Sequence, residues 1–152
     1  EAYYGLLFGL SALLAYAVGA DALPKVAWLL YVGTALWVAS WAIVVAVLQV
    51  EQDARAGLRS MAMVFGRNDR LMIALLQLTA LAALVLAGRQ LELGVFYRIG
   101  LGAALVLMAY QQFLLHSRHP VGYRRAYLNN LWVGAAVFTG IVFHYLCLAQ
   151  HG

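Results

Sequence analysis

Five long apolar segments divide the sequence and constrain what it can fold into. They cover residues 2–20, 26–48, 71–88, 95–115 and 128–148. A membrane-spanning α-helix needs about 20 mainly apolar residues, and it satisfies its own backbone hydrogen bonds in lipid. Each segment is long enough to cross a bilayer in this way. We therefore expect an all-α, polytopic membrane protein with about five transmembrane helices, forming one domain over residues 1–152.

The composition excludes both a soluble globular protein and a disordered one. Of the 152 residues, 65% are hydrophobic and 11% are charged, whereas a soluble domain has about 25% charged residues. A chain this short cannot bury so much apolar surface in one core, so a soluble globular fold is excluded. Disorder is excluded as well, because it requires low hydrophobicity. The single cysteine, Cys147, rules out an internal disulfide and a cysteine-based metal site.

The basic residues are distributed unequally between the two sides of the expected bundle. The connections over residues 49–70 and 116–127 carry seven of them: Arg55, Arg59, Arg67, Arg70, Arg118, Arg124 and Arg125. The opposite side has three, which are Lys25, Arg89 and Arg98. The positive-inside rule then places the N-terminus and both long connections in the cytoplasm, and the C-terminus outside. This asymmetry also explains the net charge of +4 without a nucleic-acid-binding face, so we expect no nucleic-acid partner.

The connection over residues 49–70 mixes acidic, basic and hydroxyl side chains at the membrane surface. Such a mixture suits an anionic headgroup or a diphosphate, because a carboxylate holds Mg²⁺ while arginine and serine donate directly to phosphate oxygens. Asp53, Arg55, Arg59 and Ser60 are the candidate residues. From the spacing alone, we favour a solvated connector whose arginines only set the topology.

Polar and aromatic residues inside the apolar segments are the candidates for a ligand cavity. They are Trp41, Gln111, Asn129 and Asn130; the alternative for each is ordinary packing or capping of helices. His144 lies in the last segment, where an ionisable side chain can mark a functional site such as a haem or chlorophyll ligand. No other apolar segment contains a histidine to complete a bis-histidine haem site, so we expect His144 to pack near the membrane surface.

Several motifs after residue 50 resemble a known family. They are Asp53-x-x-x-Gly57-x-Arg59-Ser60-x-Ala62-x-x-Phe65-Gly66 with Asp69 and Arg70-Leu71, then Tyr110-Gln111-Gln112 and Asn129-Asn130-Leu131-Trp132-Val133-Gly134. Together they resemble the UbiA superfamily of intramembrane aromatic prenyltransferases, in particular the 4-hydroxybenzoate polyprenyltransferases of ubiquinone synthesis. The resemblance covers essentially the whole chain, and implies helices five to nine of a nine-helix bundle.

The chain departs from this family at its metal-binding residues. The family's second aspartate-rich motif is Y-D-T-x-Y-A-x-x-D-x-x-x-D, and the corresponding stretch here runs from Trp41 to Asp53. Asp53 keeps the last carboxylate, whereas Gln49 replaces the preceding one and Trp-Ala-Ile replaces the Tyr-Asp-Thr triplet. Residues four apart share a helix face, so the geometry is kept, but a neutral amide is a poor ligand for Mg²⁺. The family's first motif, N-D-x-x-D-x-x-x-D, is absent from the sequence given.

The resemblance and these departures together give our functional expectation. We expect a degenerate diphosphate and Mg²⁺ site at Gln49, Asp53, Arg55, Arg59 and Ser60, with Asp53 as its metal-ligand candidate. We assign no catalytic residue and expect no cofactor. The chain is then a half-length UbiA-like protein, inactive alone, that serves as an accessory or structural subunit in a bacterial inner membrane and contacts other membrane subunits and quinone or isoprenoid lipid.

Two alternatives to this expectation remain. In the first, the chain is the C-terminal part of a split or truncated Mg²⁺-dependent aromatic prenyltransferase, and Mg²⁺ is its cofactor. The other is a pigment-associated or structural membrane protein with only a historical link to the family.

Overall fold

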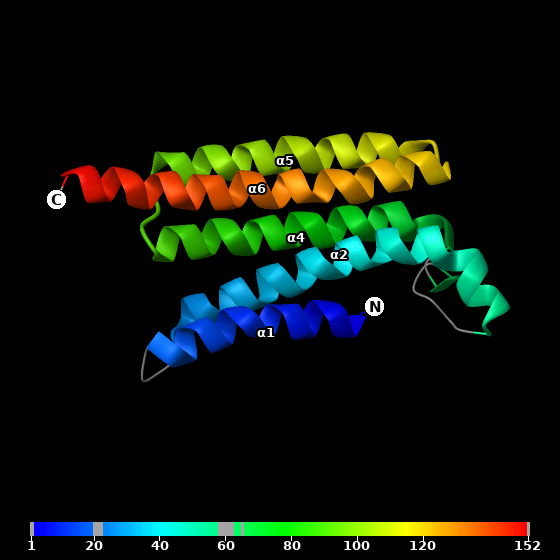
Figure 1. The fold of residues 1–152 in the computed structure, drawn as a ribbon, viewed down its shortest axis with the longest axis horizontal. Helices are drawn as coiled ribbons and strands as arrows, with labels where there is room; N and C mark the ends of the chain where they lie inside the picture. The colour runs from blue at the N-terminus through cyan, green and yellow to red at the C-terminus, as the bar shows by residue number, and fades with distance from the viewer. Residues whose placement is uncertain (1, 20–22, 58–62, 65, 152) are drawn as a thin grey trace.

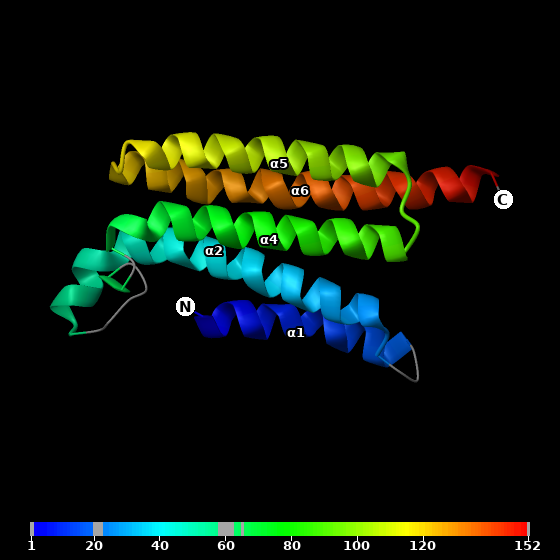
Figure 2. The same ribbon diagram turned by 180° about the vertical axis from the view of Figure 1, so that it is seen from behind.

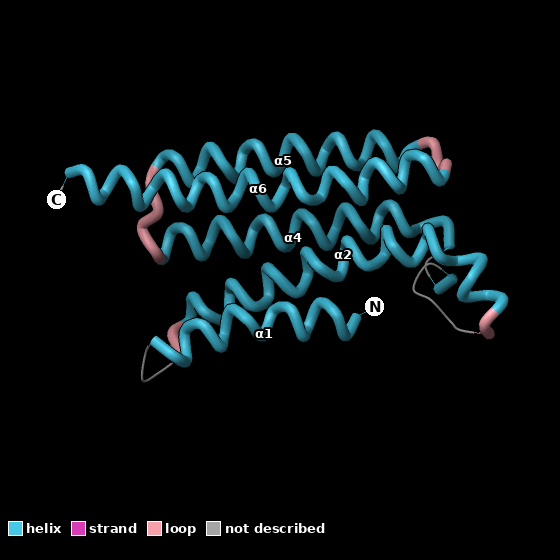
Figure 3. Tube along the Cα trace, viewed as in Figure 1, coloured by secondary structure: helices cyan, strands magenta, loops and turns pink. Residues whose placement is uncertain are grey.

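The fold is entirely helical over the part of the chain that the structure describes. This computed structural model describes residues 2–19, 23–57, 63–64 and 66–151. Its elements are α1 (Ala2–Gly19), α2 (Lys25–Arg55), a short 3₁₀ helix η1 (Gly66–Asn68), α4 (Asp69–Gln90), α5 (Val95–His116) and α6 (Pro120–His151). No strand occurs within these ranges, and Figure 3 shows helices and loops there. The all-α expectation is confirmed.

The helices lie side by side as an elongated bundle (Figures 1 and 2). Helix α2 packs against both α1 and α4, while α5 and α6 form a closely packed hairpin that contacts the rest through α2 and α4. The connection from α2 to α4 and the turn from α5 to α6 lie at one end, which we call the loop end. The α1–α2 and α4–α5 turns lie at the opposite end, which we call the turn end.

The helices have the length and composition of membrane spans. Among the described residues, four stretches qualify: Lys25–Val50, Gly66–Gln90, Val95–His116 and Pro120–Ala149. In α1, a shorter apolar stretch covers Leu6–Gly19. Many large apolar side chains on the bundle surface are exposed, among them Phe113, Leu131 and Phe138. Because lipid takes the place of water around such a surface, these exposed side chains identify an integral membrane protein.

The two connections at the loop end are shorter in the structure than the apolar segments suggested. Helix α2 continues to Arg55, and the backbone then turns at Gly57, whose φ of +69° suits glycine. Helix α6 begins at Pro120 and not near residue 128. Proline is favoured in the first helical turn because an N–H group there has no acceptor within the helix, so its absence costs no hydrogen bond. Hydropathy does not detect the last turns of α2 or the first turns of α6, because these helical turns are polar and lie outside the apolar stretches.

The hairpin of α5 and α6 depends on two facing glycines. A Cβ added to Gly100 would lie 2.6 Å from the carbonyl oxygen of Ala136, and one added to Gly140 would lie 2.9 Å from the carbonyl oxygen of Phe96. Small residues let helix backbones approach closely where no hydrophobic effect drives them together in lipid. This contact fixes how α6, with its polar residues, sits against α5.

Candidate functional site

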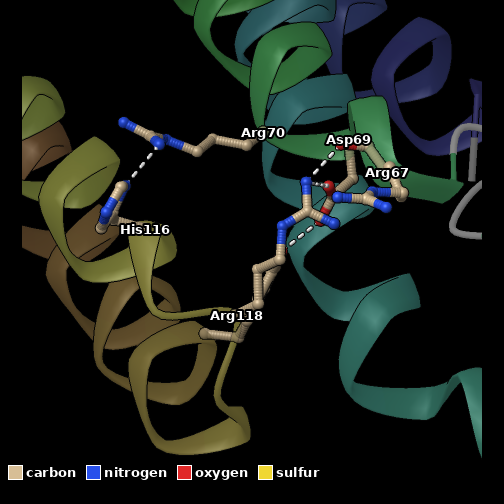
Figure 4. A network of polar contacts seen from close by, with 6 residues as sticks. Arg67, Asp69, Arg70, His116 and Arg118 are labelled. Atoms are coloured by element: carbon tan, nitrogen blue, oxygen red, sulfur yellow. Dashed lines mark hydrogen bonds and ion pairs between the residues drawn. The ribbon is translucent and has the colours of Figure 1, made fainter.

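A buried carboxylate organises the loop end of the bundle. Asp69 is the first residue of α4, and it is only 3% exposed. The hydroxyl of Tyr123 on α6 donates a hydrogen bond to its Oδ2 atom. The Arg118 guanidinium lies 3.7 Å from its Oδ1 atom (Figure 4). The positive end of the α4 dipole also favours a carboxylate at this position.

The same cluster joins the two connections at the loop end. Arg118 donates a hydrogen bond to the carbonyl of Arg67 in η1, and it adopts a φ of +52° in the α5–α6 turn. Beside it, Nη1 of Arg70 lies 2.9 Å from Nδ1 of His116. Figure 4 shows the Arg118 side chain reaching from the turn across to Asp69. Asp69 thus holds the start of α4 against α6 and the α5–α6 turn.

The predicted diphosphate residues that the structure describes lie at the loop end. Gln49 and Arg55 lie in the last turns of α2, and both are exposed. Asp53 belongs to the same stretch of helix, four residues after Gln49, but its side chain lies outside the described set. Arg59 and Ser60 fall outside the described residues altogether. The structure therefore places three of the five predicted residues in the last turns of α2, and the two whose side chains it describes are exposed.

Asp53, the predicted metal-ligand candidate, has a side chain outside the described set, so the structure does not test the predicted Mg²⁺ site directly. Across the described residues, no group of three His, Cys, Asp or Glu side chains could hold a metal ion. Gln49 offers a neutral amide where Mg²⁺ prefers a carboxylate. The carboxylate at the start of the next long helix, Asp69, is already bound by Tyr123 and paired with Arg118.

Two of the four predicted cavity residues share a groove between α2 and α6. This groove has a volume of about 720 Å³, and both Trp41 and Asn130 line it. Nε1 of Trp37 donates a 2.8 Å hydrogen bond to Oδ1 of Asn130 across the groove. The ring of Trp41 stacks on that of Tyr127, with 5.4 Å between centroids. The groove therefore combines an aromatic wall with one polar pair.

The other two predicted cavity residues make contacts between helices instead. Gln111 on α5 is buried, and its Oε1 accepts a 2.6 Å hydrogen bond from Nε2 of Gln77 on α4. Asn129 on α6 donates a 3.1 Å hydrogen bond to the carbonyl of Leu107 on α5. A hydrogen bond between helices stabilises packing modestly in lipid. Neither residue lines the groove between α2 and α6.

His144 has a structural contact at the turn end. Its Nδ1 atom accepts a 3.0 Å hydrogen bond from the backbone N–H of Gly94, in the turn between α4 and α5. It also lies edge-on to Tyr145. The contact holds this turn against α6, in line with the packing role expected for His144.

The sequence alone does not predict the cluster around Asp69. The distribution of basic residues predicts only that Arg118 helps to set the membrane topology, and Tyr123 is not among the predicted site residues. One signal is present, because Asp69 immediately precedes the long apolar segment beginning near Leu71. A carboxylate there begins a helix and, if buried, requires donors. The sequence does not reveal which donors these are, because Arg118 and Tyr123 lie about 50 residues later, in the α5–α6 turn and the first turn of α6.

Comparison with known proteins gives a consistent result. Residues 1–134 match the UbiA prenyltransferase family. The 4-hydroxybenzoate octaprenyltransferase of Methylococcus capsulatus is 42% identical over 146 residues, which cover 96% of this chain and 50% of that protein. For the enzyme of the same name from Nitrosococcus oceani, the identity is 41% over 96% of this chain and 51% of that protein.

A third relative, the 4-hydroxybenzoate octaprenyltransferase of Hahella chejuensis, is 41% identical over 93% of this chain and 47% of its own length. The chain thus spans about half the length of the curated relatives it matches. No solved structure shows a significant match to it. With its helical membrane bundle and its matched residues, the chain belongs to the UbiA prenyltransferase family.

Proposed function

We propose that this chain does not catalyse prenyl transfer alone and acts as an accessory or structural subunit of a membrane assembly. The observation that carries the proposal is the amide of Gln49 on the exposed end of α2, where the family motif has a carboxylate. A transferred prenyl group leaves behind a diphosphate, whose developing charge must be neutralised for the reaction to proceed. The neutral amide of Gln49 is a poor replacement for a carboxylate that would hold Mg²⁺ on the diphosphate, so we assign no catalytic step to this chain.

The groove between α2 and α6 supports a role in contacting quinone or isoprenoid lipid. Its aromatic wall includes Trp37 and Trp41, and its volume of about 720 Å³ is within the range of small-molecule sites. The Trp37–Asn130 pair, with Thr34 and Tyr127, supplies the polar groups of a groove that is otherwise apolar. A long apolar molecule with one polar end matches this lining.

The second candidate function is the C-terminal part of a Mg²⁺-dependent aromatic prenyltransferase of the 4-hydroxybenzoate type. Its support is the identity of 42% over nearly the whole chain to the Methylococcus capsulatus enzyme. In that case the missing carboxylates would come from another polypeptide segment, and Asp53, Arg55, Arg59 and Ser60 would complete the site.

We further propose that the protein resides in a bacterial inner membrane with its loop end in the cytoplasm. The excess of arginines in the connections at that end supports this orientation. The C-terminal end of α6 would then lie outside.

An activity assay separates the two functions. The purified chain in phosphatidylcholine vesicles is incubated with Mg²⁺, a polyprenyl diphosphate and 4-hydroxybenzoate, with the full-length Methylococcus capsulatus enzyme as the positive control. We expect no prenylated product from the chain alone, and such a product would contradict the proposal. In a second arm, the chain is co-expressed with the N-terminal half of the control enzyme. Product formed only by this pair would favour the second function.

A further inference from the structure

A second groove, at the turn end of the bundle, lies between α4 and α5. Its volume is about 640 Å³, and Val85, Leu101 and Leu105 contribute to its apolar walls. Three charged residues line its mouth: Arg89, Glu92 and Arg98. Arg89 lies in the last turn of α4, and Arg98 lies one turn into α5. The groove is separate from the loop end and from the groove between α2 and α6.

The two arginines at the mouth are available to bind a ligand. Both are exposed, and within the described ranges neither forms an ion pair with a carboxylate. Glu92 belongs to the same turn, but it does not come within ion-pair distance of either one. The mouth therefore has a net charge of +1. Arg98 lies one turn into α5, so its long side chain can reach the membrane interface at the turn end beside Arg89.

The depth of the groove matches the upper part of an acyl chain. From Arg98 to Leu105 the axis of α5 rises by about 10 Å, whereas one leaflet of the hydrocarbon core is about 15 Å thick. At Gly102, an added Cβ would meet nothing within 4 Å, so the floor of the groove is open at that depth. The charged mouth thus lies at the height of lipid headgroups, while the apolar walls lie at the height of the chains.

We propose that this groove binds a phospholipid with an anionic headgroup. Its phosphate lies between Arg89 and Arg98, and one acyl chain runs along Leu101 and Leu105. Charge complementarity at the mouth selects an anionic lipid over a zwitterionic one, because each basic residue near an anionic lipid surface adds to the binding. The binding requires no catalytic residue and holds whether or not the chain transfers prenyl groups.

The test is a lipid titration followed by native mass spectrometry. The chain in detergent is titrated with phosphatidylglycerol and, in parallel, with phosphatidylcholine. We expect tighter binding of phosphatidylglycerol, and a loss of at least about tenfold in its affinity when Arg89→Gln and Arg98→Gln are combined. The control combines Arg124→Gln with Arg125→Gln, which removes the same charge from exposed positions at the loop end and should leave the tight site intact. Equal losses in both variants, or no loss in either, would overturn the proposal.

Two further arms separate the acyl chain from the headgroup. Gly102→Leu fills the groove without changing any charge, so it should weaken the binding of both lipids. Ala109→Leu adds the same side chain at an exposed position on α5 outside the groove, and it should have no effect. Inorganic phosphate should not displace phosphatidylglycerol, because it lacks the acyl chain. Displacement by phosphate, or full lipid binding by the Gly102→Leu variant, would show that no acyl chain occupies the groove.

Discussion

Tyr123 on α6 donates a hydrogen bond from its hydroxyl to the buried carboxylate of Asp69 at the start of α4. The two residues are separated by 54 positions in the sequence. Through this bond the first turn of one helix is held by the first turn of another, and Arg118 from the turn before α6 completes the contact. At the loop end, these polar contacts add to the apolar packing of Tyr123 against residues such as Leu115 and Ile73.

Removing the Tyr123 hydroxyl should destabilise the fold. Tyr123→Phe leaves a buried carboxylate without its neutral donor, and we expect a loss of about 1–3 kcal/mol in the free energy of unfolding. The control is Tyr127→Phe, because Tyr127 is 39% exposed and its ring can still stack on Trp41. Thermal unfolding in detergent measures both variants. An unchanged melting temperature for Tyr123→Phe would contradict the assigned role of this hydrogen bond.

The pair of Gln77 and Gln111 should behave as one unit. Either single change to leucine removes this hydrogen bond and leaves one buried amide group without its partner, although Gln77 Oε1 still accepts a 3.5 Å hydrogen bond from Gln112 Nε2. Each should cost about 1–3 kcal/mol, whereas the double change should cost much less than the sum. A double-mutant cycle of unfolding free energies tests this. Strict additivity of the two single changes would show that the 2.6 Å contact contributes no coupling.

Two glycines on α5 give opposite predictions for the same substitution. Gly100→Ala places a Cβ against the backbone of α6, 2.6 Å from a carbonyl oxygen, so we expect a loss of about 1–3 kcal/mol through overpacking. Gly102→Ala meets nothing within 4 Å, and it should be neutral or slightly stabilising because alanine favours the helix. Similar destabilisation by both would refute the close approach of α5 and α6.

The proposed orientation can be tested with single cysteines. In a Cys147→Ser background, Gln90→Cys reports on the turn end and Ser117→Cys on the loop end, and both positions are exposed. A maleimide that cannot cross membranes should label the first variant in intact cells, and the second only after lysis. The reverse labelling pattern would contradict the proposed orientation and place the loop end outside the cytoplasm.

The fold is largely predictable from the sequence, because lipid imposes simple requirements on helices. The apolar segments locate the helices, since a span in lipid must satisfy its own backbone hydrogen bonds. Hydropathy cannot locate the start of α6 at Pro120, because the first turns of that helix are polar. The positive-inside rule assigns residues to two ends, and Figure 1 shows the connections alternating as this assignment requires.

The candidate site is less predictable, because its contacts join residues far apart in the sequence. Trp41 and Asn130 do share a groove, but Gln111 and Asn129 bind to neighbouring helices, and hydropathy contains no information on which way a side chain faces. The cluster around Asp69 depends on how the α5–α6 turn sits against α4, which only the packed bundle determines. Conversely, the replacement of a carboxylate by Gln49 is visible in the sequence alone.

The central claim is that Gln49 deprives this chain of Mg²⁺-dependent diphosphate binding, and a binding measurement tests it most directly. Equilibrium binding of geranyl diphosphate is measured with and without Mg²⁺ for the unmodified chain, for Gln49→Asp, and for Gln90→Asp as a control with the same charge at the turn end. We predict no Mg²⁺-dependent binding by the unmodified chain or by Gln90→Asp, and a gain for Gln49→Asp, because two carboxylates four residues apart share a helix face. Mg²⁺-dependent binding by the unmodified chain that equals that of Gln49→Asp would contradict the claim.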